Sequence, residues 1–107
     1  DGLYVEVKSV TLHCGDGAGA FPDAVSARAT KHLLESQSAM ARGHRAALVF
    51  AVLHDGITRV APAQDIDPIY ASALRQAMAS GLEVYTLLND ITVDGIYPVA
   101  AHRWDTH

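Results

Sequence analysis

The stretch LYVEVKSVTL, residues 3–12, decides the fold prediction, because its β-branched and aromatic residues favour a strand. Further along, residues 45–53 read RAALVFAVL, an apolar run typical of a parallel strand buried on both faces. A helix is predicted between these strands, over residues 23–42. Together the three segments predict a β-α-β crossover, with adjacent parallel strands and a right-handed connection.

The predicted helix begins at Pro22-Asp23, a pair that favours a helix start, and ends at Gly43. One face of it is apolar, formed by residues at helical spacing: Val25, Ala29, Leu33, Ser36 and Met40. The segment before the helix, HCGDGAGA at residues 13–20, contains three glycines. We therefore expect an irregular loop there.

The second half of the chain continues the α/β pattern. Asp55-Gly56 predicts a hairpin turn into a short return strand over 57–60. Asp67-Pro68 predicts the cap and first position of a helix that ends at Gly81. A further strand is expected over 82–88, and Asp94-Gly95 predicts a turn that joins short strands over 91–93 and 96–97. The tail from Ala100 shows no pattern, and we interpret Trp104 as a packing residue. These elements predict one α/β domain over residues 1–107, with helices flanking a mixed sheet.

Composition sets further bounds. The chain has 107 residues, 50% of them hydrophobic, which suffices for one small domain with one core. Its longest apolar run, residues 46–53, is far shorter than the roughly 18 residues of a membrane span. We see no secretory signal, and the single cysteine, Cys14, cannot form an internal disulfide. We therefore expect a cytoplasmic protein without a membrane partner.

The formal charge of −4 is unevenly distributed. Residues 1–54 carry five acids and five bases, whereas residues 55–107 carry seven acids and three bases. Such a chain lacks the uniformly basic footprint of a simple nucleic-acid binder. An anionic ligand should prefer the first half, because the local potential steers it.

Glu6-Val7-Lys8 is the motif with the clearest chemistry. Positions i and i+2 of a strand project from the same face, so the carboxylate and the ammonium stand side by side. A carboxylate suits Mg²⁺, and a neighbouring ammonium can stabilise charge on a phosphate. Glu6 and Lys8 are therefore candidate catalytic residues, and Glu6 is a candidate metal ligand. Judged on spacing alone, an ordinary ion pair is the commoner explanation.

A second group of candidates lies on the first predicted helix. Arg28, Lys31, His32 and Glu35 fall on the face opposite the apolar stripe. Arg28, Lys31 and His32 are candidate nucleic-acid-binding residues, because basic groups on one face can contact phosphates. A solvated helix surface, with Lys31 and Glu35 paired, explains the same pattern equally well.

Several stretches resemble the sugar fermentation stimulation protein A family. They are YVEVKSVTL (4–12), FPDAVSARATKHL (21–33), GHRAALVF (43–50) and APAQDIDPIYASALRQAMASGLEV (61–84). The resemblance covers about residues 3–90. Ala29 stands where the family pattern has a glycine, a change that a helix tolerates.

The resemblance implies both a fold and a function. Family members are bacterial and archaeal proteins described as nonspecific DNA binders and linked to the regulation of maltose metabolism. They combine an N-terminal OB-like domain with a C-terminal domain similar to PD-(D/E)xK nucleases. A restriction-endonuclease-like fold is therefore implied, in which Glu6 and Lys8 match the (D/E)xK element and the helix with Arg28, Lys31 and His32 follows it. The implied partner is DNA, bound nonspecifically through its backbone, and the implied cofactor is Mg²⁺.

The sequence departs from the family pattern at its start. It matches only the C-terminal part of that pattern, so we expect the OB-like domain and the first nuclease-like strands to lie outside this chain. Nucleases of this class carry their first acid on the preceding strand, and Asp1 is too close to Glu6 for that place. A metal held by one carboxylate should bind weakly. The strand over 3–12 would then be an open sheet edge, through which we expect self-association.

Three interpretations are left. The first, which we adopt, is a nonspecific DNA-binding domain of a sugar fermentation stimulation protein. The second is a Mg²⁺-dependent nuclease, with Glu6 as metal ligand and Lys8 as the charge-stabilising group. The third is a packing or oligomerisation domain in which Glu6 and Lys8 form only an ion pair.

Overall fold

The predicted β-α-β crossover is present. Strands β1 (Leu3–Ser9) and β4 (Arg45–Leu53) pair in parallel, and helix α1 (Ala27–Ala41) connects them. The computed structural model describes residues 2–53 and 56–104. Strand β4 has the bounds predicted from its apolar run.

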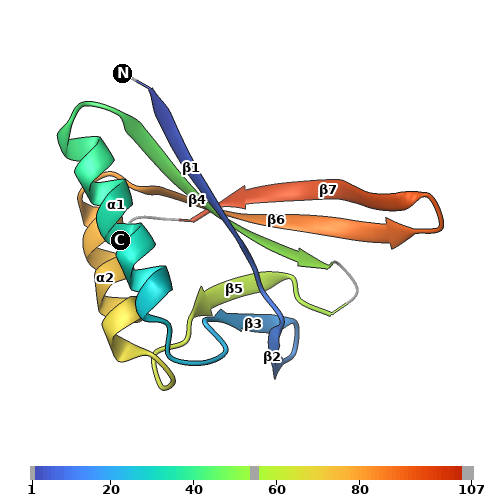
Figure 1. Cartoon of the computed structure of the whole chain (residues 1–107). Coiled ribbons are helices and arrows are strands. Elements are labelled where there is room, and N and C mark those ends of the chain that lie inside the picture. The colour runs from blue at the N-terminus through green and yellow to red at the C-terminus, as the bar shows by residue number, and fades with distance from the viewer. Residues whose placement is uncertain (1, 54–55, 105–107) are drawn as a thin grey trace.

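In residues 2–53 and 56–104 the chain forms two sheets and two helices. The remaining elements are β2 (Leu12–Gly15), β3 (Ala18–Phe21), β5 (Arg59–Pro62), α2 (Pro68–Ala79), β6 (Glu83–Thr92) and β7 (Gly95–Arg103). The larger sheet has the order β1-β4-β6-β7, with β6 parallel to β4 and β7 antiparallel to β6; β2, β3 and β5 form the smaller sheet. Both helices cover the same face of the larger sheet (Figure 1), which confirms the predicted mixed sheet flanked by helices. Neither of the helices in the described residues is long and apolar enough to cross a bilayer.

The hydrophobic core lies between the larger sheet and the helices. Leu48 and Phe50 project into it from β4, and Tyr70 and Leu74 enter it from α2, each at most 2% exposed. Phe21 on β3 closes one end, with its ring centroid 5.4 Å from those of both Phe50 and Tyr70. Burial of these side chains holds the helix layer on the sheet.

The first strand is shorter than predicted, and the segment expected as a loop is a β-hairpin. β1 ends at Ser9, after which Val10 is buried and donates its N–H to the Ala51 carbonyl. Strands β2 and β3 then pair through a turn at Asp16 and Gly17, which have positive φ angles of 51° and 77°. Glycine adopts such angles without steric cost. The glycine-rich composition therefore supports a tight hairpin turn instead of irregular structure.

Helix α1 begins later than predicted. Its N-cap is Ser26, whose hydroxyl oxygen accepts a hydrogen bond from the Ala29 N–H at 3.0 Å. The Ser26 N–H itself donates to Oδ2 of Asp67 at 2.9 Å. Asp23 therefore lies before the helix. Val25, expected in the buried stripe, is 74% exposed because it also precedes the cap.

The predicted hairpin after β4 is wrong in its pairing. Asp55 lies outside the described residues, and the expected return strand over 57–60 is replaced by β5, which pairs in parallel with β3. Ile57 is buried in the core, and the Thr58 N–H donates to the Gly17 carbonyl at 2.8 Å. These contacts direct the chain to the smaller sheet.

The second helix lies where it was predicted, whereas the last two strands are longer than predicted. α2 begins at Pro68, with Oδ1 of Asp67 accepting from the Tyr70 N–H at 3.0 Å, and Gly81 follows the helix. β6 and β7 form a long antiparallel ribbon in which pairing extends to Tyr85 opposite Arg103. Residues 100–103, at the start of the tail predicted to have no pattern, are thus strand. This strand forms by pairing with β6, so the composition of the segment alone does not predict it.

Trp104 packs against the core, as predicted. Its ring stacks on Phe50 with a centroid distance of 5.3 Å, and its Nε1–H donates to Oγ1 of Thr86 at 2.8 Å. The end of the described chain is therefore held on the central strands.

We expect Asp67→Ala to lower the free energy of unfolding by about 1–3 kcal/mol, because it removes the α2 cap and leaves the Ser26 N–H without its acceptor. Urea denaturation measures this change. Asp23→Ala is the matched control. Asp23 precedes the helix and is exposed, so this variant should stay within about 0.5 kcal/mol of the wild type. Equal losses in both variants would contradict the assigned caps.

Candidate functional site

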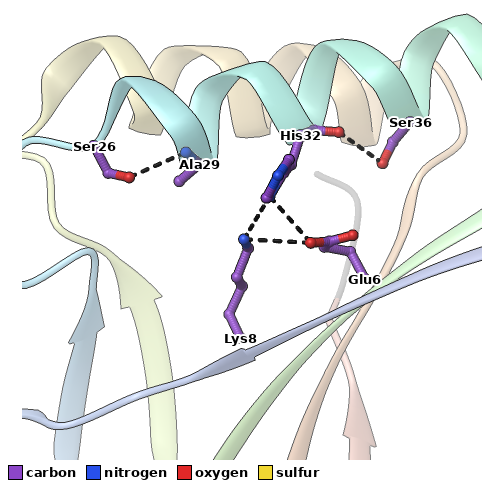
Figure 2. A network of polar contacts seen from close by, with 6 residues as sticks. All are labelled: Glu6, Lys8, Ser26, Ala29, His32 and Ser36. Carbon is purple, nitrogen blue, oxygen red and sulfur yellow. Dashed lines mark hydrogen bonds and ion pairs between the residues drawn. The ribbon is translucent and has the colours of Figure 1, made fainter.

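Three of the predicted site residues meet between β1 and α1 (Figure 2). Nζ of Lys8 lies 3.3 Å from Oε1 of Glu6. Nδ1 of His32 lies 2.6 Å from that Nζ and 3.0 Å from the same Oε1. The side chains are 16% (Lys8), 23% (Glu6) and 19% (His32) exposed, so this Glu6–Lys8–His32 cluster is shielded but still reachable from solvent.

Local structure explains how the cluster forms. Glu6 and Lys8 are two residues apart on β1 and project toward α1, whereas Val7 between them projects to the other face and is 59% exposed. The Ser26 cap marks where α1 starts, and its buried residues Ala29, Leu33, Ser36 and Ala39 mark the side that faces the core. His32 lies beside this buried stripe and points to β1. The strand spacing and the buried stripe of α1 together determine the geometry of the cluster.

The protons of the cluster cannot satisfy all three of its contacts at once. If Nδ1 of His32 carries no proton, it accepts a hydrogen bond from Lys8, and its lone pair then faces the Glu6 carboxylate. If Nδ1 is protonated, it donates to Glu6 and then repels Lys8. These two arrangements exclude each other.

Two tyrosines that the sequence analysis did not single out as site residues adjoin the cluster. The pKa of Tyr4, on β1, is raised by partial burial and further by the carboxylates of Glu6 and Glu35. The pKa of Tyr70 on α2, which is 1% exposed, is raised by burial and by the charges of Asp67 and Glu6. Both phenols therefore stay protonated at neutral pH. Tyr4 had a sequence signal, since it lies two residues before Glu6 on the same side of the strand.

Arg28 and Lys31 lie apart from the cluster. Both are exposed near the start of α1, and within the described part of the chain neither contacts the cluster. Arg28 is one helical turn before His32 and so lies on the same side of the helix. Lys31 borders a shallow hollow of about 240 Å³ beside Leu34. The helix thus turns His32 inward and leaves the Arg28 and Lys31 side chains in solvent.

The described residues alone do not form a closed metal site. Among them, no three His, Cys, Asp or Glu side chains gather around one point. Glu6 offers a single carboxylate, and the Lys8 ammonium lies 3.3 Å from one of its oxygens. Mg²⁺ usually takes one or two carboxylates and keeps water or phosphate oxygens as its other ligands. Glu6 therefore fits Mg²⁺ only together with a bound phosphate.

A larger hollow, of about 670 Å³, lies at the carboxyl ends of β1 and β4. Its lining includes Val10, Ile57 and Leu87, and the described residues that line it contain no Lys or Arg. A polyanion would find little attraction there. The cationic groups near the start of α1 are a better place for a phosphate backbone.

Comparison with known proteins identifies the family. The family model described as "Sugar fermentation stimulation protein RE domain" matches residues 1–95. The chain belongs to the sugar fermentation stimulation protein family. Two curated sugar fermentation stimulation protein homologs, from Saccharophagus degradans and a Shewanella species, are 52% and 51% identical over 92 and 94 residues. The matches cover 86% and 88% of this chain but 40% of each relative, so the chain spans about 40% of the length of these relatives.

A solved structure supports the fold assignment. The structure of Pyrococcus furiosus SfsA in complex with Ca²⁺ matches with a TM-score of 0.82 and 26% identity, over 92% of this chain and 43% of the other. The expected restriction-endonuclease-like fold is therefore confirmed.

We expect the triple variant Glu6→Leu, Lys8→Met, His32→Leu to be as stable as the wild type within about 1 kcal/mol, or more stable. Shielded charges are costly to desolvate, and apolar side chains of similar size remove that cost. The free energy of unfolding in urea measures the effect. A loss above about 2 kcal/mol would show that the cluster serves the fold, which would weaken its assignment as a functional site.

Proposed function

We propose that this chain is a nonspecific DNA-binding domain and that the cluster and the basic residues early in α1 contact the phosphate backbone. The observation that supports this most directly is the contact of His32 with Lys8, at 2.6 Å. It means that a strand and a helix contribute potential phosphate contacts at one place. Two other cations, Arg28 and Lys31, are exposed on the same helix.

The local charge supports binding of a polyanion in spite of the net charge of −4. Lys8, Arg28 and Lys31 lie on β1 and early in α1, where the helix dipole adds positive potential. Glu6 lies within the cluster beside Lys8, and the buried Asp67 carboxylate already accepts from the Ser26 N–H at the start of α1. A phosphate would therefore be attracted chiefly by the exposed side chains of Arg28 and Lys31. Backbone contacts of this kind carry no base sequence information, which is consistent with nonspecific binding.

At the level of the whole protein, we propose a role in the regulation of maltose or sugar metabolism, as the family resemblance implies. We place this role in the cytoplasm, where the exposed free thiol of Cys14 would stay reduced.

We expect Lys8→Ala and Arg28→Ala each to weaken DNA binding by a similar factor on duplexes of different sequence. Each variant should also lower the slope of log affinity against log salt by about 0.9, since one phosphate contact is lost. Fluorescence anisotropy with labelled duplexes at several salt concentrations measures both effects.

Arg75→Ala is the matched control for these variants. Arg75 is an exposed arginine on α2, bonded to Oε1 of Gln64 at 2.9 Å and outside the proposed surface. This variant should leave affinity and salt slope unchanged. The proposal fails if the wild-type chain shows no salt-dependent binding, or if Arg75→Ala weakens binding as much as Arg28→Ala does.

A Mg²⁺-dependent nuclease is the second candidate function. It is favoured by the Glu6 carboxylate beside the Lys8 ammonium and by the divalent cation named with the Pyrococcus furiosus relative. Glu6 would hold the ion together with phosphate oxygens. The bound ion would neutralise negative charge at the phosphate. Lys8 would stabilise further negative charge on the same phosphate.

For this second function we expect Mg²⁺-dependent nicking of supercoiled plasmid, lost in Lys8→Ala and retained in Arg75→Ala. Gel electrophoresis with and without EDTA reads out the nicked form. DNA binding without nicking would reject the nuclease and leave the binding function in place. Nicking that survives Lys8→Ala would point to a contaminating nuclease.

A further inference from the structure

We propose that the larger hollow, at the carboxyl ends of β1 and β4, binds a neutral and largely apolar small molecule with one hydrogen-bond donor. The volume of the hollow, about 670 Å³, is that of an ordinary ligand pocket. Ligands of open α/β sheets bind outside the carboxyl ends of the parallel strands, and the hollow lies where β1 and β4 end. This inference is independent of the proposed DNA-binding function.

The walls of the hollow come from several strands of the larger sheet and from segments that belong to the smaller one. Ala51 of β4, Leu87 of β6 and Ile96 of β7 line it, together with His13 of β2 and Ile57, which precedes β5. β4, β6 and β7 all lie on the same side of β1. Strands paired to the outer edge of β1 would therefore extend the sheet away from these walls, and the hollow does not depend on how that edge is covered.

Asn89 supplies the hollow with an unpartnered hydrogen-bond acceptor. It lines the hollow and is only 8% exposed, and its Nδ2 donates to the carbonyls of Val52 and Leu87, each at 3.2 Å. Because both partners are carbonyl oxygens, they fix the orientation of the amide, and Oδ1 accepts no hydrogen bond from the described residues. Among those residues no fully buried side-chain nitrogen or oxygen lacks a partner, so Oδ1 reaches the open space that Asn89 lines.

The absence of charge in the lining favours a neutral ligand. The described residues that line the hollow include no Asp, Glu, Lys or Arg. Both nitrogens of His13 are occupied, since Nδ1 accepts from the Gly15 N–H at 3.2 Å and Nε2 donates to the Gly56 carbonyl at 2.8 Å. In this arrangement the imidazole carries one proton and no charge. An ion would lose its hydration in the hollow without gaining a counter-charge.

The apolar part of the lining limits how many polar groups the ligand can carry. Val10, Val52 and Ile57 line the hollow, and each is at most 7% exposed. The hydroxyl groups of Ser9 and Thr11 belong to residues that are exposed to solvent. A sugar has a hydroxyl on nearly every carbon, and burying such groups without partners is costly. The hollow therefore suits an apolar molecule with a single hydroxyl or N–H group, which would donate to Oδ1 of Asn89.

Equilibrium dialysis with two probes, 2-naphthol and 2-methoxynaphthalene, tests the proposal. The first carries the O–H group that would donate to Oδ1 of Asn89, and the second lacks it. We expect the 107-residue chain to bind one molecule of 2-naphthol. It should bind 2-methoxynaphthalene about tenfold more weakly, because Oδ1 is then left without a donor. Maltose should not bind to the hollow.

Ala51→Trp tests where the probe binds. The larger side chain would fill the hollow, so this variant should lose 2-naphthol binding while its circular dichroism stays native. Ala101→Trp is the matched control, because Ala101 is exposed opposite Leu87 on β7 and does not line the hollow. This variant should bind 2-naphthol with the affinity of the wild type.

The same dialysis on the whole protein shows whether the hollow is open there, and we expect the same affinity for 2-naphthol as in the 107-residue chain. The proposal is overturned if either protein does not bind 2-naphthol, or if both probes bind equally well. It is equally overturned if folded Ala51→Trp still binds 2-naphthol, if Ala101→Trp loses binding to the same extent, or if maltose binds in place of 2-naphthol.

Discussion

Asp67 holds the first turns of both helices with one carboxylate. Its Oδ1 caps α2 through the Tyr70 N–H, and its Oδ2 accepts from the N–H of Ser26, the cap of α1. Asp67 is only 3% exposed, so both hydrogen bonds are shielded from competing water. Asp67 thus ties the start of α1 to the start of α2, while the buried stripe of α1 turns His32 toward Glu6 and Lys8.

The Glu6–Lys8–His32 cluster places charged and polar side chains close together where they are largely shielded from water. The Lys8 ammonium and the Glu6 carboxylate share one His32 nitrogen, and no single protonation state of that nitrogen satisfies both contacts. Clusters that serve only the fold pair their polar groups fully, because an unsatisfied shielded contact is costly.

Several elements could be predicted because their signals are local. After Arg45, every residue of β4 is apolar, and Asp67-Pro68 contains both the cap and the first residue of α2. The start of α1 could not be predicted in the same way, because Asp23 and Ser26 are both good caps. Asp67, 41 residues after Ser26, favours the serine by accepting its N–H. The partner of β5 could not be predicted for a similar reason. It is β3, which comes from a segment whose glycines suggest a loop.

The sequence by itself determined the crossover, the central strand and the side-by-side placement of Glu6 and Lys8, because each depends on spacing within one element. It also indicated the family through stretches that span most of the chain. Only the tertiary structure decided that His32 turns inward to these two residues while Arg28 and Lys31 remain in solvent. Lys31 is turned away by the rotation of α1, and Arg28 lies at the very start of the helix, so their exposure depends on how α1 packs on β1 and β4.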